Sequence, residues 1–163
     1  MKISRDEYYL KVLESIRLRS TCDRGKSGAL IVVRNRVVAT GYVGSPPGLP
    51  HCDDIGHMMQ GDHCIRTVHA EMNAILQAAK FGTPVENGTM YCTMVPCFSC
   101  AKSIVSAGIW RVVAVYDYHD SLHSKYLLHN PMQNRELTIL NPGSFCYDCR
   151  SVEDATKSGL PTL

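Results

Sequence analysis

Hydrophobic positions recur along the chain with a helical period in some segments and an alternating period in others. Near the N-terminus, Tyr9, Leu13 and Ile16 fall on one face of a helix. Ser4 precedes this pattern and is a residue type that caps helices. We therefore predict a first helix over about residues 4–19.

The hydrophobic runs that follow are short and predict strands. Residues 28–42, GALIVVRNRVVATGY, contain two apolar runs separated by Arg34, Asn35 and Arg36, which predicts a β-hairpin. Residues 44–64, GSPPGLPHCDDIGHMMQGDHC, are rich in Gly, Pro, Asp, His and Cys. We predict a long irregular segment here, and loops of such length usually carry function.

Helical and strand patterns then alternate along the rest of the chain. Glycines end two of the helices, at Gly82 and Gly108, and Pro96 opens the second of them. The predicted elements are a helix at 69–82, a strand at 89–95, a helix at 96–108, a strand at 109–118, a helix at 120–130 and a strand at 135–141.

The order α-β-β-α-β-α-β-α-β predicts an α/β fold with three layers, α-β-α. In this fold, helices cover both faces of a mixed five-stranded sheet. We expect one domain over residues 1–145 and an irregular C-terminal tail over residues 146–163.

Composition and charge narrow the possible partners. The chain has 163 residues, of which 45% are hydrophobic and 20% charged, as expected for one soluble globular domain. The net charge of +2 is too small to indicate a nucleic-acid surface. No hydrophobic run reaches the ~18 residues of a membrane span, and the polar N-terminus lacks the hydrophobic core of a secretory signal. We therefore expect a cytoplasmic protein with no membrane or nucleic-acid partner.

Eight cysteines are many for such a chain, and in a cytoplasmic protein they indicate metal rather than disulfides. His69, Cys97 and Cys100 would provide the three protein ligands of a catalytic zinc site, with one position left open for water. Cys97 and Cys100 share one face of a helical turn because they are three residues apart. Since His69 opens the preceding helix, two positive helix ends would meet at the metal and favour thiolates.

Glu71 lies two residues after His69, roughly 200° further around an ideal helix. It would therefore stand beside the metal-bound water and move protons, rather than bind the ion. A lone C-x-x-C motif is often a structural zinc or redox site, but H-x-E followed by P-C-x-x-C is the signature of zinc-dependent nucleobase deaminases. A zinc-stabilised binding module without catalysis would not need this carboxylate.

Over residues 4–140 the chain resembles the cytidine and deoxycytidylate deaminase superfamily, and within it looks most like the deoxycytidylate (dCMP) deaminases. The resemblance implies a cytidine deaminase-like fold and hydrolysis of dCMP to dUMP and ammonia, which provides the precursor of dTMP. It also implies a homo-oligomer, typically a hexamer, that is regulated by dCTP with magnesium and by dTTP. The segments that carry it are RSTCDR, ATGYVGSPPGLPHCDDIGH, GDHCIRTVHAEMNAI and MVPCFSCAKSIVSAGI.

The resemblance also assigns nucleotide contacts to the segment of Tyr42, Val43, Gly44 and Ser45. Val43 departs from the family pattern, because many relatives have an Asn there that hydrogen-bonds a nucleotide. Pro47 stands where a basic residue is common. Both departures concern nucleotide binding and regulation rather than the deamination chemistry.

Further nucleotide contacts are predicted at two places. Arg24 and Lys26 form a basic turn that would hold a 5′-phosphate, or would be solvated. Tyr116 and Tyr118 follow the strand beside the zinc helix. One of them would cover the base or bond the phosphate, unless both are ordinary strand-end tyrosines.

The cysteines upstream of His69 fit a second, structural zinc with Cys22, Cys52 and Cys64 as ligands. Some dCMP deaminases carry such a zinc, and the resemblance supports it here. His57 is the preferred fourth ligand and His63 the alternative, because His63 adjoins Cys64 and adjacent residues are less suited to one ion. The competing interpretation is scattered buried thiols and surface histidines.

The remaining cysteines and histidines form no metal pattern. Cys146 and Cys149 are interpreted as free thiols, and Cys92 as a small buried residue. Trp110 is expected in the core or at a subunit contact. The histidines expected to be solvated or locally bonded are His51, His119, His123 and His129.

The function predicted from the sequence is therefore deamination of dCMP. The alternative is a deaminase of dCTP, of a 5-modified dCMP or of a base in a polynucleotide. The near-neutral charge counts against a tRNA substrate, which calls for a basic surface.

Overall fold

The computed structural model describes residues 2–118 and 121–145. Its centre is a five-stranded sheet in which β1 runs antiparallel to β2 and β5, whereas β5, β6 and β7 are parallel. The mixed sheet predicted from the sequence is confirmed. In spatial order, the strands are β2 (Arg36–Tyr42), β1 (Gly28–Val33), β5 (Thr89–Met94), β6 (Arg111–Asp117) and β7 (Glu136–Phe145).

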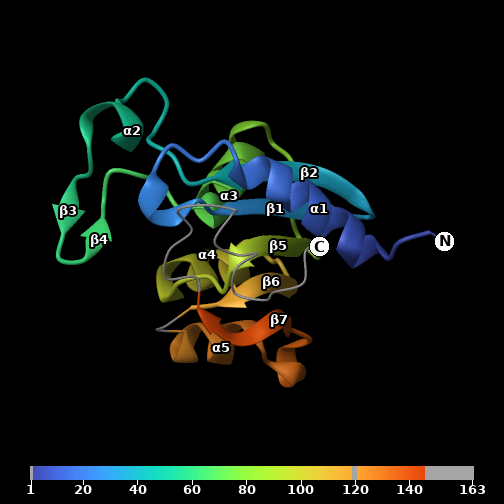
Figure 1. The fold of residues 1–163 in the computed structure, drawn as a ribbon. Coiled ribbons are helices and arrows are strands. Elements are labelled where there is room, and N and C mark those ends of the chain that lie inside the picture. The colour runs from blue at the N-terminus through green and yellow to red at the C-terminus, as the bar shows by residue number, and fades with distance from the viewer. Residues whose placement is uncertain (1, 119–120, 146–163) are drawn as a thin grey trace.

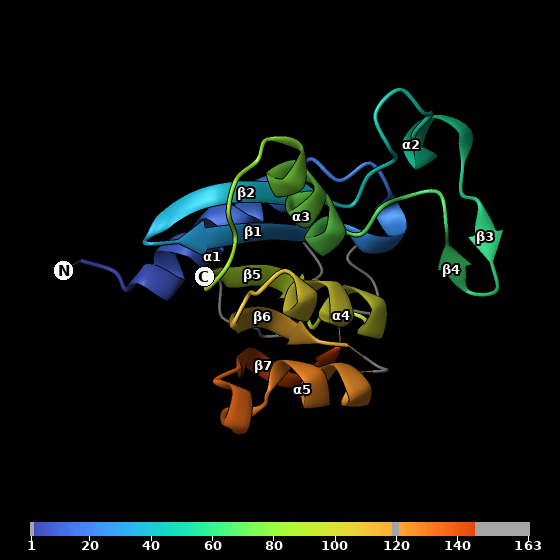
Figure 2. The same ribbon diagram turned by 180° about the vertical axis from the view of Figure 1, so that it is seen from behind.

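Helices cover both faces of the sheet and complete the three layers (Figures 1 and 2). α1 (Arg5–Arg17) packs on one face, in front of β1 and β2 in Figure 1. The opposite face carries α3 (Ala70–Lys80), α4 (Phe98–Ser106) and α5 (Leu122–Leu128). Within the described ranges, no helix has both the length and the hydrophobicity to cross a membrane.

Alternate side chains of each central strand contribute to two separate cores. In β1, Ala29 and Ile31 pack towards α3 and α4, whereas Leu30 and Val32 pack towards α1. The same alternation continues in β5 and β6, because successive side chains of a strand point to opposite faces. Because β2, β5 and β6 run in the same direction, their C-terminal ends lie at the same end of the sheet.

A glycine lets α3 approach the sheet closely. A Cβ atom on Gly41 of β2 would clash with the carbonyl oxygen of Ala70 and lie 2.5 Å from the amide nitrogen of Ala74. Both obstacles are backbone atoms of α3, so they cannot move aside without moving the helix. Gly41 therefore sets the position of the first turns of α3.

Local sequence signals explain most element ends. The hydroxyl of Ser4 accepts a hydrogen bond from the Glu7 amide at 3.1 Å and caps α1. Arg34 and Asn35, with φ of 49° and 62°, form the turn of the predicted hairpin. α4 begins at Phe98, two residues later than predicted, because Cys97 is its N-cap residue.

Residues 47–66 form a lobe at one side of the sheet (Figure 1). The lobe contains the short helix α2 (Cys52–Ile55) and a hairpin of β3 (Met59–Gln60) and β4 (His63–Cys64). The prediction of an irregular segment was wrong in this respect. Strands of two residues are too short to show a hydrophobic period.

The last strand is also longer than predicted. β7 extends to Phe145, which pairs with Asp117, although the prediction ended the strand at Asn141. Residues 142–144, Pro-Gly-Ser, are typical of turns, so pairing with β6 outweighs local preference here. Two short 3-10 turns, η1 (Asp23–Gly25) and η2 (Pro131–Gln133), complete the described fold.

Candidate metal centres

Three metal-binding side chains meet where α3 and α4 begin. His69 is the N-cap residue of α3, Cys97 is the N-cap residue of α4, and Cys100 lies in the first turn of α4. The Nδ1 atom of His69 is 3.6 Å from the Sγ atom of Cys97 and 3.5 Å from that of Cys100. We call these three residues the first cluster, whose ligand atoms all lie within 4.8 Å of one another.

The three side chains of the first cluster differ in their pKa values. Hydrogen bonds with Cys100 and His69 lower the pKa of Cys97 to about 4, although burial acts in the opposite direction. The hydrogen bond with Cys97 raises the pKa of His69 to about 9. The same cysteine and burial raise the pKa of Cys100. Cys97 is thus the thiolate of a donor set, two sulfurs and one imidazole nitrogen, that zinc uses in catalytic sites.

Glu71 lies beside the first cluster without being one of its donors. It is the second residue of α3, and only 6% of its surface is exposed. Burial raises the pKa of its carboxyl group, and the neighbouring His69 opposes this shift. A buried carboxyl group next to three metal donors is placed to exchange protons with anything bound there.

Four further donors converge where the lobe joins the rest of the protein. Cys22, Cys52, His57 and Cys64 place their ligand atoms within 4.8 Å of one another, and we call them the second cluster. The Sγ atom of Cys22 is 3.7 Å from Nδ1 of His57, and the Sγ atoms of Cys52 and Cys64 are 3.6 Å apart. His63, the alternative ligand, is exposed in β4 and lies outside this group. Three thiols and one imidazole match a closed structural zinc site.

The thiols of the second cluster differ in acidity. Burial, together with the neighbouring thiols, raises the pKa of Cys52 to about 12. At Cys64 burial acts in the same direction, but hydrogen bonds from the amides of Arg66 and Met58 outweigh it, and the pKa falls to about 7. The group therefore has a thiol that ionises readily at neutral pH.

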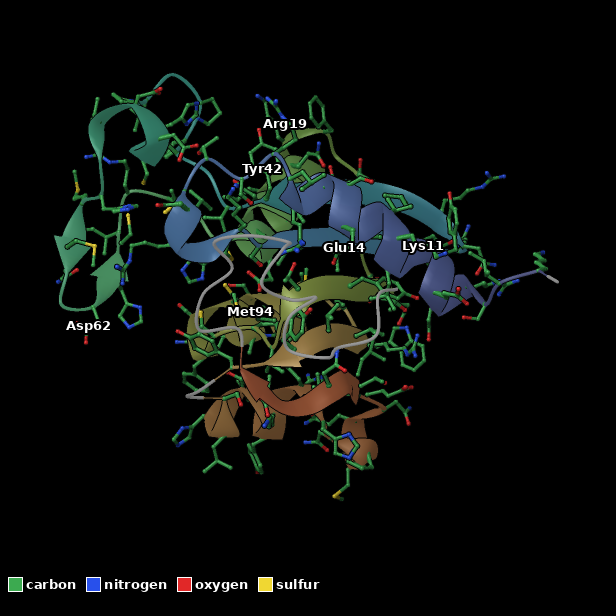
Figure 3. All side chains as sticks on the ribbon, viewed as in Figure 1. Lys11, Glu14, Arg19, Tyr42, Asp62 and Met94 are labelled. Atoms are coloured by element: carbon green, nitrogen blue, oxygen red, sulfur yellow. The ribbon has the colours of Figure 1, made fainter. Side chains whose placement is uncertain are left out.

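Asp23 and Arg24 add contacts around the second cluster that the sequence analysis missed. The Oδ1 atom of Asp23 is 3.1 Å from Nε2 of His57. The Nη2 atom of Arg24 donates a hydrogen bond of 2.9 Å to the carbonyl oxygen of Asp62, which Figure 3 labels in the hairpin of the lobe. The feature of the sequence that could have identified Asp23 is its position directly after Cys22, a predicted ligand.

Comparison with known proteins identifies the family. A family model, the cytidine and deoxycytidylate deaminase zinc-binding region, matches residues 3–116. The chain belongs to the cytidine and deoxycytidylate deaminase family. The matched residues include both clusters and Glu71, so both clusters lie within the zinc-binding region of this family.

Two curated relatives are longer than this chain. ComE operon protein 2 of Bacillus subtilis is 49% identical over 117 residues, which cover 72% of this chain and 62% of the relative. The deoxycytidylate deaminase of Saccharomyces cerevisiae is 36% identical over 136 residues, which cover 80% of this chain and 43% of the relative. The chain thus spans less than two thirds of the length of each.

Two phage proteins are similar to this chain over most of their own length. The deoxycytidylate deaminase of Mycobacterium phage D29 is 35% identical over 120 residues, which cover 66% of this chain and 91% of that protein. The dCMP deaminase of cyanophage S-TIM5, solved in complex with dCMP and dUMP, superimposes with a TM-score of 0.73 at 27% identity. That comparison covers 85% of this chain and 98% of the phage enzyme.

Residues 42–45, which we call the nucleotide segment because the resemblance assigns nucleotide contacts to them, lie directly beside the first cluster. Gly44 and Val68 form an antiparallel bridge, with N–O distances of 3.3 and 2.9 Å, and Val68 precedes His69. The side chain of Val43 is half-buried against the core below α3 and α4. The hydroxyl of Ser45 is buried and has no hydrogen-bond partner within the described residues. The ring of Tyr42, labelled in Figure 3, is partly exposed at the end of β2.

The other predicted nucleotide contacts lie in two regions. The guanidinium of Arg24 is directed to the lobe, and Lys26 ends η1. The carbonyl of Tyr116 accepts a hydrogen bond of 2.9 Å from the amide of Val95, two residues before Cys97. Tyr118 packs against the same core as α4. Both tyrosines therefore lie at the edge of the sheet that holds the first cluster.

The remaining predictions have mixed outcomes. Cys92 is buried, as predicted, with its Sγ atom 3.7 Å from the carbonyl oxygen of Val113. The ring of His123 lies edge-on to Phe98, with 5.8 Å between the ring centroids. Trp110 is 41% exposed, which excludes the core and leaves the subunit contact as the prediction for this residue. Three predicted residues lie outside the described ranges, namely His119, Cys146 and Cys149.

Proposed function

We propose that this protein hydrolyses dCMP to dUMP and ammonia with a zinc ion bound by His69, Cys97 and Cys100. The observation that carries the proposal is the first cluster, with the buried carboxyl group of Glu71 beside it. The likeness to deoxycytidylate deaminases favours dCMP over other amidine substrates. The product would supply dTMP synthesis in the cytoplasm.

Each residue has a distinct part in the proposed reaction. Zinc bound to the three donors would supply a Lewis acid that lowers the pKa of a water molecule. Glu71 takes a proton from the attacking water and passes protons to the ring nitrogen and the departing amino group, so that attack at C4 ends in release of ammonia. The burial of Glu71 keeps these protons at the site instead of exchanging them with solvent.

The nucleotide would lie along the edge between the nucleotide segment and the two tyrosines. The Gly44–Val68 bridge brings Tyr42, Val43, Gly44 and Ser45 next to His69. The unpartnered hydroxyl of Ser45 offers a hydrogen bond to the sugar or phosphate. Arg24 and Lys26 would add charged contacts to the nucleotide, and Tyr116 and Tyr118 would add aromatic ones.

The second cluster would hold a structural zinc that is separate from catalysis. Its ligands would be Cys22, Cys52, His57 and Cys64, a closed set without a free position. The family resemblance further supports a homo-oligomer, hexameric in form, and a dCTP effector that binds with magnesium. We also propose a single catalytic domain over residues 1–145, whereas the predicted tail, residues 146–163, lies outside the described residues.

A substrate panel tests the proposal. The purified protein with zinc is offered cytidine, dCMP, dCTP, a 5-modified dCMP and a tRNA, and ammonia release is measured. We expect the highest kcat/KM with dCMP, loss of activity on chelation and recovery with zinc. A higher kcat/KM with dCTP, with the 5-modified nucleotide or with the tRNA would show that this compound, rather than dCMP, is the substrate. If none of these compounds releases ammonia, the protein would instead be a zinc-stabilised binding module without catalysis.

A further inference from the structure

Three consecutive residues attach the lobe to the rest of the protein. Cys22 contributes a donor to the second cluster, Asp23 contacts His57 of the lobe, and Arg24 binds the carbonyl oxygen of Asp62. The lobe has little core of its own to hold it in place. Its large hydrophobic side chains that are at least 45% exposed are Leu49, Ile55, Met58, Met59 and Ile65.

The two nitrogen atoms of His57 face different partners. Nδ1 lies 3.7 Å from the Sγ atom of Cys22 and faces the donors. Nε2 lies 3.1 Å from the carboxylate of Asp23. A carboxylate at Nε2 holds the proton of a neutral imidazole there, which leaves the lone pair of Nδ1 for a metal ion. The contact with Asp23 therefore favours the tautomer protonated at Nε2, with Nδ1 facing the donors.

Backbone hydrogen bonds connect this site to the nucleotide segment. The amide of Thr21, next to Cys22, donates to the carbonyl of Val43 at 3.0 Å. The amide of Val43 donates to the carbonyl of Ser27 at 3.0 Å. Gly44 is bridged to Val68, which adjoins His69. The second cluster and the first cluster are therefore joined through the residues proposed to contact the nucleotide.

We propose that Asp23 is a positioning residue of the second metal site and that this site sets the nucleotide segment for substrate binding. The proposal rests on the second zinc site proposed above, and it adds a residue and a role to that site. Asp23 acts by fixing His57 as an Nδ1 ligand. The bound metal then fixes the position of Cys22. Because Thr21 is adjacent to Cys22 and hydrogen-bonds Val43, the position of the nucleotide segment is fixed as well.

Asp23→Asn tests the proposal because it preserves the shape of the side chain and removes its charge. Zinc affinity is measured by competition with a chromogenic chelator, which needs no substrate. We expect the second zinc to bind about 10- to 100-fold more weakly, as when a carboxylate partner of a metal-bound histidine is removed. The first zinc should bind as in the wild type. Asp53→Asn is the matched control, since Asp53 is an exposed carboxylate that also follows a ligand, Cys52.

The kinetic readout separates positioning from general damage. At limiting zinc, Asp23→Asn should raise KM for dCMP and leave kcat per catalytic zinc at the wild-type value. Excess zinc should return KM to the wild-type value. A wild-type protein with one zinc, or unchanged zinc affinity in Asp23→Asn, would overturn the proposal. A raised KM that excess zinc does not return to the wild-type value would also overturn the proposal. If the protein binds two zinc ions but does not deaminate dCMP, the proposed function fails while the metal role of Asp23 stands.

Discussion

Two residues of one helical turn have different roles because of where their side chains lie. His69 caps α3 and directs Nδ1 to the two cysteines, whereas Glu71 lies inside the protein beside them. The carboxyl group is therefore available to a bound water molecule rather than to the metal. This difference can be tested at Glu71 without touching a ligand.

Glu71→Gln should retain the fold and zinc but lose turnover by about 10²- to 10⁴-fold, because it removes proton transfer and keeps the shape. Ammonia release gives the rate, and metal analysis gives the zinc content. Glu86→Gln, a change at an exposed glutamate, is the control. A Glu71→Gln rate above a tenth of the wild-type rate would contradict the assigned role.

Val43 leads to a prediction about regulation. Its side chain packs against the core and has no hydrogen-bonding group, whereas the family pattern leads us to expect Asn at this position. A missing hydrogen bond costs about 0.5–1.5 kcal/mol, or roughly 2- to 13-fold in affinity. We expect weak or absent activation by dCTP, and a gain of activation in Val43→Asn. The measurement is dCMP turnover with and without dCTP and magnesium. Strong activation of the wild type by micromolar dCTP would show that Val43 has no regulatory meaning.

At the scale of elements, the contact between β2 and α3 positions the catalytic residues. Gly41→Ala would place a Cβ atom against two backbone atoms of α3, so the helix must shift. Overpacking of this kind costs about 1–3 kcal/mol, and movement of His69 and Glu71 should also reduce kcat. Urea unfolding and ammonia release measure the two effects. Gly25→Ala, where a Cβ atom would meet nothing within 4 Å, should change neither. Equal stability of the two variants would show that α3 accommodates the methyl group.

The elements that the sequence predicted well are those with a long hydrophobic period or a strong cap. α1 and the β1–β2 hairpin belong to this group, because Ser4, Arg34 and Asn35 act locally. The hairpin of the lobe and the end of β7 were missed, since tertiary pairing decides them. The second cluster was predicted from residue type, spacing and the family resemblance, with His63 left as the alternative to His57. Asp23 was missed because its contact with His57 spans 34 residues of chain.

At the scale of the whole molecule, one ion pair joins the N-terminal helix to the sheet. Arg111 of β6 contacts both carboxylate oxygens of Asp6 in α1, at 3.0 and 2.9 Å. The hydroxyl of Tyr91 donates to the same carboxylate at 2.6 Å. The hydrogen bonds from Arg111 lower the pKa of Asp6 below its ordinary value of 3.8, although burial opposes them.

This lowered pKa predicts a contribution to stability that depends on pH. The folded-state pKa of Asp6 lies below the unfolded value, so the contribution is present above about pH 4 and is lost as the pH falls through the folded pKa. Asp6→Asn should be less stable than the wild type at pH 7, and the difference should shrink in acid. Urea unfolding at a series of pH values measures it, with Asp53→Asn as the control. A difference that stays constant down to about pH 2 would contradict the prediction.

The attachment of the lobe has a consequence for the order in which the molecule opens. The sheet is held by two hydrophobic cores, whereas the lobe would be held by the proposed second zinc, which a chelator would remove. Chelation should therefore speed amide hydrogen exchange throughout residues 47–66 and leave β1 and β5 protected. Mass spectrometry of peptides after exchange would measure this, and uniform exchange over the whole chain would contradict it. On this prediction the lobe would be a separate unit of local unfolding, and the local concentration of zinc would determine how often it opens.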